Sequence, residues 1–295
     1  MHPTEFDRAR IRALLAEGEH TLAAVPHPER ARRDAETLFL HVLKKTDPER
    51  NLAWLIAHED EAVATETARR FRALVGRRAA GEPIQYITGE AEFYGLAFHV
   101  NRDVLIPRPE TEHLVERAIG LARAFGRPRI VDVGTGSGAI AVALAKVLPE
   151  ARICATEISS AALEVARGNA ERHGVASRVR FFEGDLLEPV ASERFDIVVS
   201  NPPYVAENDR DSLTVEVRDN EPRAALFAGA DGFDVHRRLI PAAFEALVRG
   251  GFVALEIGYG QRDAVEALLT GAGFGGVEFT ADLQGIPRVA TGRRP

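Results

Sequence analysis

The chain has 295 residues, of which 45% are hydrophobic and 27% are charged, and its formal net charge is −7. This length and composition are typical of a soluble globular protein with a main domain and a smaller one. The negative charge disfavours a protein that binds nucleic acid through many phosphate contacts.

Residues 1–76 are expected to form a small helical domain, because residues 4–76 contain almost no glycine and repeat apolar residues at helical spacing. Pro28 is placed to open one helix. The positions expected to face the core are Ala35, Leu38, Phe39, Val42, Leu43, Ala68, Phe71, Leu74 and Val75. Trp54 is also expected in the core. The domain has no catalytic constellation, so we interpret it as a module that recognises a partner.

Residues 77–110 are predicted to link the domains and to contain a β-hairpin. Glycine and proline change the composition near residues 76–83, and runs of β type follow at residues 84–87 and 93–100. Arg108 then lies between two prolines that stiffen the start of a helix. A rigidly held guanidinium suits a substrate or cofactor lid, and a solvated arginine at a helix start fits the pattern equally well.

A strand, a glycine turn and a helix open the domain predicted over residues 111–295. Residues 129–133 predict a buried strand, and residues 139–145 predict an apolar helix. The turn between them consists of Gly134, Thr135, Gly136, Ser137 and Gly138. Such a turn opens its backbone N–H groups to a ligand that approaches the main chain closely. Its G-x-G-x-G spacing differs from the G-x-G-x-x-G of dinucleotide-binding proteins and favours an adenosyl ligand without a pyrophosphate.

The next two predicted strands lead to acidic residues. Residues 152–157 end at Glu157, about 20 residues after the glycine turn, where a carboxylate can accept both hydroxyls of a ribose. Capping of the next helix is the alternative role for this residue. Residues 179–184 lead to Asp185 and Leu186, which are candidates to contact the amino group and the ring face of an adenine. A structural role for these two residues is equally consistent with the pattern.

The fourth predicted strand, residues 195–199, leads into the run Ser200, Asn201, Pro202, Pro203 and Tyr204. Two consecutive prolines forbid strand pairing and force the chain to leave the sheet stiffly. The Asn201 side-chain oxygen and the Pro202 carbonyl can both accept hydrogen bonds from one planar NH2 group, with the Tyr204 ring packed on it. A rigid strand-ending turn with a capping asparagine is the alternative.

Strands alternate with helices to the end of the chain, which predicts a mostly parallel sheet covered by helices on both faces. The remaining helices are expected at residues 233–249 and 263–270, and the remaining strands at residues 252–257, 277–279 and 288–290. Open sheets of this class bind ligands at the carboxyl ends of their strands.

Several other functions are excluded or disfavoured. Cys154 is the only cysteine, which excludes an intrachain disulfide and a cysteine-based zinc cluster. The histidines show no spacing typical of metal ligands, so we expect no metal site. No apolar run approaches the roughly 18 residues of a membrane span, and the first residues lack the apolar core of a signal peptide. We therefore expect a cytoplasmic protein that does not enter a membrane.

Together, the glycine turn, Glu157, Asp185 and the run Asn201–Tyr204 resemble the S-adenosylmethionine-dependent methyltransferases that alkylate a planar nitrogen. The Asn-Pro-Pro-Tyr run is shared by adenine-N6 DNA methyltransferases and protein-glutamine N5 methyltransferases. Further stretches are similar to the release factor glutamine methyltransferases, namely Ile106–Glu112, Asn220–Pro222 with Ala225-Leu226, and Gly229–Gly232. Where that family often has an aromatic residue beside the adenine, this chain has Leu186.

The resemblance implies a Rossmann-like fold with a mostly parallel seven-stranded sheet, a small N-terminal helical bundle and a connecting β-hairpin. It also implies S-adenosylmethionine as cofactor, and methylation of the glutamine side-chain amide in the Gly-Gly-Gln motif of bacterial peptide chain release factors. Cofactor contacts are then expected from Gly134, Thr135, Gly136, Ser137, Gly138, Glu157, Asp185, Leu186 and Asn201. Catalysis is expected from Asn201, Pro202 and Tyr204, and substrate binding from these residues with Pro203 and Arg108.

Three other functions stay open on the sequence alone: glutamine methylation of a ribosomal protein, adenine-N6 methylation of nucleic acid, and a non-enzymatic regulator that binds an adenosyl ligand. The first would use the same chemistry. The second would need base flipping and a basic surface, which the net charge of −7 disfavours. We expect a monomer whose partner is a release factor and which contacts no nucleic acid.

Overall fold

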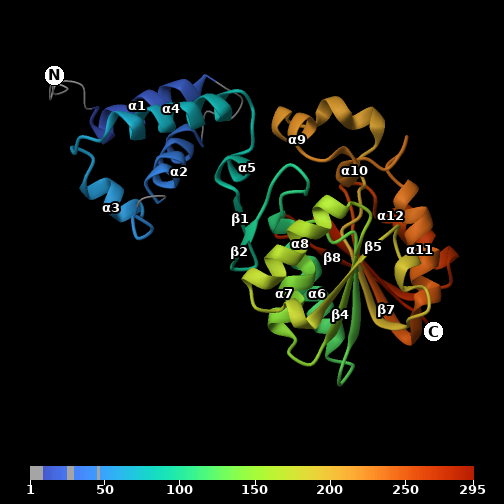
Figure 1. The fold of residues 1–295 in the computed structure, drawn as a ribbon. Coiled ribbons are helices and arrows are strands. Elements are labelled where there is room, and N and C mark those ends of the chain that lie inside the picture. The colour runs from blue at the N-terminus through green and yellow to red at the C-terminus, as the bar shows by residue number, and fades with distance from the viewer. Residues whose placement is uncertain (1–8, 25–29, 45–46) are drawn as a thin grey trace. The chain divides into compact units, whose positions relative to one another are not determined.

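The computed structural model describes residues 9–24, 30–44 and 47–295. The chain forms two compact units (Figure 1). The helical unit consists of Met1–Gly89 and Val215–Asn220, and the sheet unit consists of Glu90–Thr214 and Glu221–Pro295. The predicted domain boundaries after residues 76 and 110 stay predictions. The predicted helix start at Pro28 lies outside the described residues.

Most helices of the helical unit surround one apolar core. The helices are α1 (Ile11–Ala23), α2 (Ala31–Lys44), α3 (Leu52–Ala57), α4 (Thr65–Ala79), α5 (Ile84–Thr88) and α9 (Val215–Asn220). Every position predicted to face the core is buried or packs against it. Phe39 and Phe71 meet edge to face at its centre, with ring centroids 5.2 Å apart. Trp54 lies at the rim of the core, half-buried, with its ring stacked on that of His58.

Residues 84–87 form part of α5, so the prediction of a β-type run there was wrong. The helix ends at Gly89, whose φ of +77° is the left-handed conformation typical of a helix C-terminus. Tyr86 and Ile87 are both buried, and burial of two adjacent side chains overrides their β propensity. A hairpin does occur in the predicted linker, but its antiparallel strands are β1 (Glu90–Phe93) and β2 (Leu96–His99). A two-residue turn therefore interrupts the run predicted at residues 93–100.

The sheet unit contains seven strands in the order β5-β4-β3-β6-β7-β9-β8. Their bounds are β3 (Arg129–Val133), β4 (Arg152–Glu157), β5 (Val179–Glu183), β6 (Phe195–Ser200), β7 (Leu247–Glu256), β8 (Gly275–Ala281) and β9 (Pro287–Arg293). All neighbours are parallel except β9, which is antiparallel to β7 and β8, so the predicted mostly parallel seven-stranded sheet is confirmed. β7 begins inside the helix predicted to reach residue 249, because Leu247 already pairs with Phe195.

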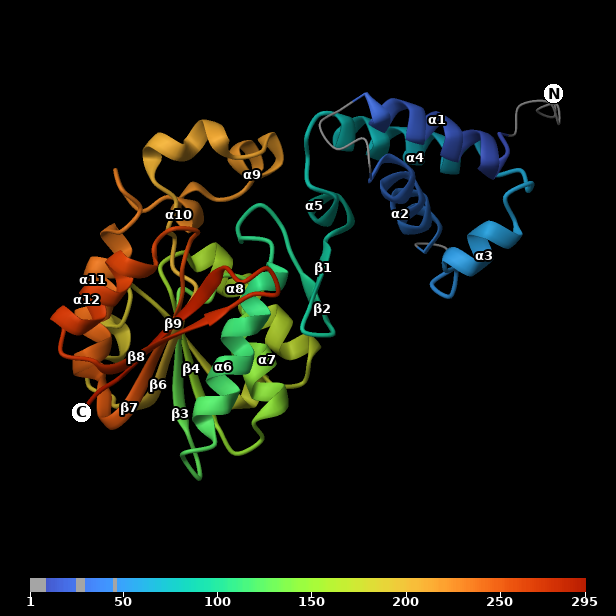
Figure 2. The same ribbon diagram turned by 180° about the vertical axis from the view of Figure 1, so that it is seen from behind.

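Helices cover both faces of this sheet (Figure 2). One face carries α6 (Glu112–Ala122), α7 (Ala139–Val147) and α8 (Ser160–Arg172), and the other carries α11 (Asp234–Ala246) and α12 (Arg262–Gly271). The shorter segments are η3 (Pro109–Thr111), η4 (Ala176–Arg178), η5 (Glu188–Val190), η6 (Glu207–Ser212) and α10 (Arg223–Leu226). Successive strand residues enter opposite cores, as Ile130 and Val131 do, which explains the continuous apolar runs of the sequence.

The strand order changes direction at β3. The chain passes from β3 to β4 and β5 on one side of the sheet and returns to β6 on the other. Val133, the last residue of β3, is the register partner of both Thr156 and Ser200. The segments that follow β3, β4 and β6 therefore leave the sheet side by side, at the kind of edge where open α/β sheets bind ligands.

Candidate active site

The glycine turn after β3 exposes its main chain at two of its three glycines. Gly134, Gly136 and Gly138 all have left-handed φ angles, of +71°, +54° and +82°. A Cβ atom added at Gly134 or Gly136 would meet no protein atom within 4 Å, so open space lies over the backbone there. At Gly138 it would lie 3.1 Å from Ala166, so this glycine also allows α8 to pack closely.

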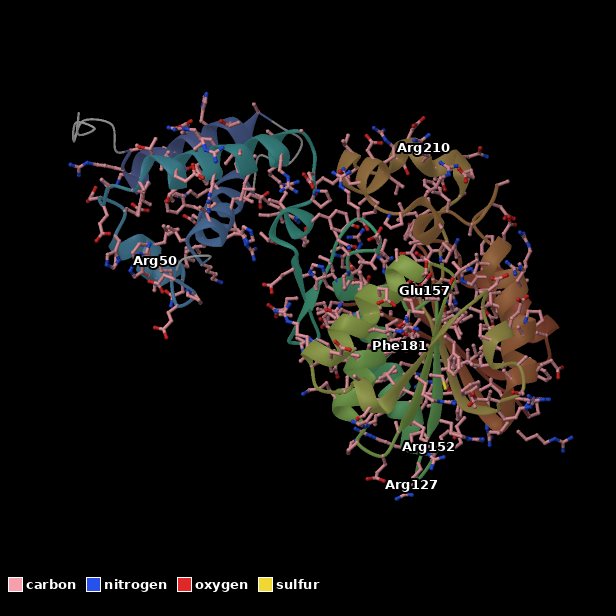
Figure 3. The ribbon with its side chains drawn as sticks, in the orientation of Figure 1. Arg50, Arg127, Arg152, Glu157, Phe181 and Arg210 are labelled. Carbon is pink, nitrogen blue, oxygen red and sulfur yellow. The ribbon has the colours of Figure 1, made fainter. Side chains whose placement is uncertain are left out.

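Glu157 is held against the same turn. Its Oε2 accepts a hydrogen bond from the Gly136 N–H at 2.9 Å, and its Oε1 accepts one from the Ser159 N–H at 3.1 Å. Each carboxylate oxygen keeps a further lone pair that can accept a hydroxyl. Ser159 caps α8 with its own side chain, so Glu157 is not needed as the cap. Figure 3 shows Glu157 at the end of the sheet unit opposite to Arg127 and Arg152.

Two buried residues that the sequence analysis did not single out form hydrogen bonds with the glycine turn. Asp132 is fully buried and accepts a hydrogen bond from the Thr135 hydroxyl at 2.6 Å. Burial raises the pKa of Asp132 to about 7, although the Thr135 hydrogen bond acts in the other direction. A carboxylate inside an apolar strand is the sequence signal that could have identified it.

The Thr135 and Ser137 side chains are both buried, so they do not face the open side of the turn.

Asn169 is the second supporting residue, and it joins the turn to the hairpin. Its Nδ2 donates to the carbonyl oxygens of Ser137 at 2.8 Å and His99 at 2.9 Å, and its Oδ1 accepts from the His99 N–H at 2.7 Å. The side chain has no exposed surface. An asparagine on the buried face of a predicted helix was the available signal.

Asp185 and Leu186 lie where β5 ends. Asp185 forms an ion pair with Arg238 of α11. Leu186 has a left-handed φ of +47°, and both Leu186 and Arg238 line a pocket of about 340 Å³. Ile158 directly follows Glu157, the residue proposed to bind the ribose, and is 63% exposed. The sequence analysis missed this exposed apolar side chain, which is a further candidate to contact the cofactor. The assignment of Asp185 and Leu186 to an adenine stays a prediction.

Asn201 and Tyr204 each contact a buried polar residue. The Asn201 Nδ2 donates to Thr111 Oγ1 at 3.1 Å, and the Tyr204 hydroxyl lies 3.5 Å from Glu256 Oε1. Glu256 is 2% exposed, and burial raises its pKa to about 7. Burial and the neighbouring Glu256 raise the pKa of Tyr204, so the phenol stays protonated. Pro202 is buried, whereas Pro203 is half-buried.

The turn at Tyr204 is supported from several directions. The Gln261 Nε2 donates to the Tyr204 carbonyl at 3.0 Å, and the Gln261 Oε1 accepts from the Gly258 N–H at 2.9 Å. A Cβ at Gly232 would lie 2.4 Å from the Tyr204 carbonyl oxygen. The stretch Gly229–Gly232, noted in the sequence for its resemblance to a family, therefore allows the close approach of two backbones.

Arg108 is fixed by Glu221. Its Nη2 donates to Glu221 Oε1 at 2.5 Å, while Glu221 Oε2 accepts from the Ile106 N–H at 3.3 Å. Glu221 is buried. This ion pair disfavours the freely solvated arginine that the sequence left open, and a role of Arg108 in substrate binding stays a prediction.

In residues 9–24, 30–44 and 47–295, no group of three or more His, Cys, Asp or Glu side chains is arranged to hold a metal ion. Within the same ranges, no helix combines the length and apolarity needed to cross a bilayer.

Two family models match the chain. The "Methyltransferase small domain" matches residues 118–229, and the "PrmC N-terminal domain" matches residues 13–89. Similar proteins named release factor glutamine methyltransferase occur in several bacteria. The protein of Geobacter sulfurreducens is 47% identical over 81% of this chain and 83% of its own length. That of Koribacter versatilis is 40% identical over 92% and 96%, and that of Bordetella pertussis is 43% identical over 90% and 96%.

Solved structures share the fold at low sequence identity. The hMettl16 catalytic domain in complex with an RNA hairpin has a TM-score of 0.55 and 17% identity, with 86% of this chain and 92% of that chain covered. A 16S rRNA N2 G1207 methyltransferase of T. Thermophilus, in complex with AdoMet and guanosine, has a TM-score of 0.50 and 21% identity, covering 70% and 50%. Both confirm a methyltransferase-type fold.

Proposed function

The chain belongs to the release factor glutamine methyltransferase family, and we propose that it transfers a methyl group from S-adenosylmethionine to the side-chain amide nitrogen of a release factor glutamine, in the motif Gly-Gly-Gln. One observation carries the proposal for this chain. Val133 and Ser200 are register partners, so the open glycine turn and Asn201 leave the sheet next to each other. A methyl donor on the turn would then lie beside the acceptor-binding carbonyl groups.

The residues at the turn fit S-adenosylmethionine. The open backbone at Gly134 and Gly136 suits the methionine part, and the free lone pairs of Glu157 suit the ribose hydroxyls. Asp185 and Leu186 are the candidates for the adenine. When bound, this cofactor supplies a sulfonium-activated methyl group. The chain therefore has to position an acceptor nitrogen and to exclude water.

An amide nitrogen is a poor nucleophile because its lone pair is delocalised. We expect the Asn201 Oδ1 and the Pro202 carbonyl to accept its two N–H groups, which directs the nitrogen at the methyl group. The Tyr204 ring would pack against the amide plane. The acceptor nitrogen would then take the methyl group that the bound cofactor supplies, and it would release one proton to solvent afterwards. No strong base is required before transfer.

The names of the relatives favour a release factor over the acceptors that the sequence left open. A glutamine of a ribosomal protein is supported only by the shared methyl-transfer chemistry, and an adenine of a nucleic acid only by the shared fold. A non-enzymatic regulator would not need Asn201 and Tyr204. The proposal includes a monomer that acts in the cytoplasm without a nucleic-acid partner. Light scattering and a mobility-shift assay with RNA and DNA test these last parts.

The decisive experiment is incubation of the purified protein with labelled S-adenosylmethionine and a purified bacterial release factor. Peptide mapping should place the label on the glutamine of Gly-Gly-Gln. A release factor with alanine at that glutamine is the control and should stay unlabelled. Label found only on a ribosomal protein or a nucleic acid, or on no acceptor, would overturn the proposal.

A further inference from the structure

The end of the sheet unit opposite to Glu157 gathers arginines from three neighbouring strands (Figure 3). Arg129 is the first residue of β3, Arg152 is the first residue of β4, and the two are register partners. Arg180 of β5 is the register partner of Cys154, which lies two positions after Arg152. Register partners and alternate residues of a strand lie on the same face of a sheet. The three arginine side chains therefore leave the sheet on one face.

These three arginines line a pocket of about 540 Å³, a volume within the range of small-molecule sites. Arg178 of η4 lines the same pocket, and Ile153 and Phe195 contribute apolar side chains to it. Among the described residues of the lining, four are thus arginines, whereas Glu193 alone is acidic. The pocket is strongly basic although the whole chain has a net charge of −7.

Two of the four arginines are paired with carboxylates. Arg180 forms an ion pair with Glu193, and Arg129 Nε lies 3.5 Å from Asp196 Oδ2. Each pair offsets one positive charge. An arginine has five N–H donors, so Arg129 and Arg180 keep donors beyond those that their ion pairs use.

The other two arginines, Arg152 and Arg178, have no carboxylate partner in the described part of the chain. Arg178 donates to the main-chain carbonyl groups of Ala145 and Leu148 at the C-terminus of α7, which fixes its guanidinium. The exposed Arg152 side chain makes neither a hydrogen bond nor an ion pair with any described residue. Like charges at opposite positions of neighbouring strands are unfavourable, and an anion in the pocket would relieve this repulsion between Arg152 and Arg129.

The arrangement fits an anion with several linked phosphate groups. A guanidinium can donate two N–H groups to one phosphate, and it is always charged. Neighbouring strands lie about 4.8 Å apart, so the arginines of β3, β4 and β5 spread over roughly 10 Å. A single phosphate is too small to contact all of them, whereas linked phosphates can. Proteins that bind a nucleic acid strand instead use a basic groove that follows its backbone, so the compact pocket favours a small molecule.

We propose that the pocket lined by Arg129, Arg152, Arg178 and Arg180 binds a small molecule that carries two or more linked phosphate groups. The pocket lies at the amino ends of the strands, whereas the glycine turn and Asn201 follow their carboxyl ends. It is therefore separate from the sites proposed for the cofactor and the acceptor. The inference concerns binding alone and does not depend on which acceptor is methylated.

The test is isothermal titration of the full chain with inorganic triphosphate, in saturating S-adenosylmethionine so that the cofactor site is occupied. We expect one triphosphate to bind per chain, more tightly than inorganic phosphate. Arg152→Gln removes the guanidinium that has no partner and should raise the triphosphate Kd at least about 10-fold, as for a lost charge-assisted hydrogen bond. Arg129→Gln should act in the same direction and decides if Arg152→Gln fails to fold.

Arg127→Gln is the matched control. Arg127 lies at the same end of the sheet unit (Figure 3), pairs with Glu150 at 3.2 Å and is not among the residues that line the pocket. Its replacement removes the same charge from the same region, so the triphosphate Kd should stay nearly unchanged.

Titration with guanosine triphosphate and with a single-stranded RNA identifies the source of the phosphates. Tighter binding of guanosine triphosphate than of inorganic triphosphate would support a nucleotide, and weaker binding would support an inorganic polyphosphate. RNA that binds more tightly than both and is released by Arg152→Gln would overturn the small-molecule proposal.

The proposal is also refuted if inorganic triphosphate does not bind to the unchanged protein, or if the Arg152 and Arg127 substitutions weaken its binding equally. Equal weakening would mean that the anion responds to the general charge of this surface and not to the pocket. None of these titrations requires methyl transfer, so a failure of the release factor assay and a failure of this proposal are distinguishable.

Discussion

At the scale of single residues, the groups proposed to hold the cofactor and the acceptor have separate hydrogen-bond partners. Glu157 accepts from the Gly136 and Ser159 N–H groups, whereas Asn201 donates to Thr111. Side chains without shared partners have nearly independent mutational effects. Binding of the cofactor and transfer of the methyl group should therefore be separable by substitution.

Asn201→Ala should lower kcat by at least about 100-fold, because the acceptor nitrogen loses one of the two carbonyl groups that orient it. Affinity for S-adenosylmethionine should stay nearly unchanged. Single-turnover methyl transfer and isothermal titration measure the two quantities on the same preparation. A comparable loss of cofactor affinity would identify Asn201 as a cofactor ligand in the first place.

Glu157→Ala should give the opposite pattern. The loss of charge-assisted hydrogen bonds to the ribose should weaken cofactor binding by about 1.5–3 kcal/mol, which is roughly a 10- to 150-fold rise in Kd. Glu157→Gln is the matched control, since its amide oxygen can still accept one backbone N–H and its effect should be smaller. The ribose assignment fails if titration shows an unchanged Kd in Glu157→Ala.

At the scale of elements, the turn that carries Asn201 and Tyr204 is shaped by other loops of the sheet unit. Val205 pairs with the segment after α10, since its N–H donates to the Leu226 carbonyl and its carbonyl accepts from Ala228, both at 2.9 Å. The backbone at Gly232 also lies close to the Tyr204 carbonyl oxygen. The rigidity that two prolines give the turn is thus completed by contacts from residues far along the chain.

Gly232→Ala should displace the Tyr204 backbone, because the new Cβ would lie 2.4 Å from the Tyr204 carbonyl oxygen. Gly285→Ala is a control with the same φ of +80° and no atom within 4 Å of the new Cβ, so it carries the same backbone strain without the clash. We expect a kcat loss of about 100-fold for Gly232→Ala beyond that of Gly285→Ala. Equal kinetics in the two variants would show that the close approach is unimportant.

Local sequence patterns made the order of helices and strands predictable. The residues that the sequence analysis missed make hydrogen bonds to residues far away in the sequence. A strand followed at once by glycines, an acid or two prolines is visible within a few residues of sequence. The bonds of Thr111 with Asn201 and of Asn169 with His99 join residues 90 and 70 positions apart, which no local pattern reveals. Residues 84–87 have β-type composition, yet the burial of Tyr86 and Ile87 made them helical.

At the scale of the whole molecule, the helical unit is built from two distant parts of the sequence. Val215–Asn220 belongs to it although this segment follows the Asn201–Tyr204 turn by only a short stretch of chain. Arg78 joins the two parts, with Nε 2.7 Å from Asp34 Oδ2 and Nη1 2.6 Å from Glu216 Oε1. Nothing in the composition of either segment predicts this pairing, because it depends on which carboxylates fold around one buried guanidinium.

Arg78→Met should destabilise the helical unit strongly. Arg78 is 5% exposed and Asp34 is 7% exposed, so the substitution leaves the buried Asp34 carboxylate without its Arg78 counter-charge. Removing one partner of a buried ion pair typically costs about 3–5 kcal/mol. Urea unfolding followed by tryptophan fluorescence measures this unit directly, because Trp54 is the only tryptophan of the chain and lies in it.

Arg69→Met is the matched control for this measurement. Arg69 also lies on α4 and pairs with Glu66 at 2.7 Å, but its side chain is 71% exposed, and exposed pairs contribute little to stability. Its unfolding midpoint should stay close to that of the unchanged protein, while that of Arg78→Met falls. Equal midpoints for the two variants would show that the buried Arg78–Asp34 ion pair does not stabilise the helical unit. A lower midpoint for Arg78→Met alone would show that the buried Arg78–Asp34 ion pair stabilises the N-terminal helices.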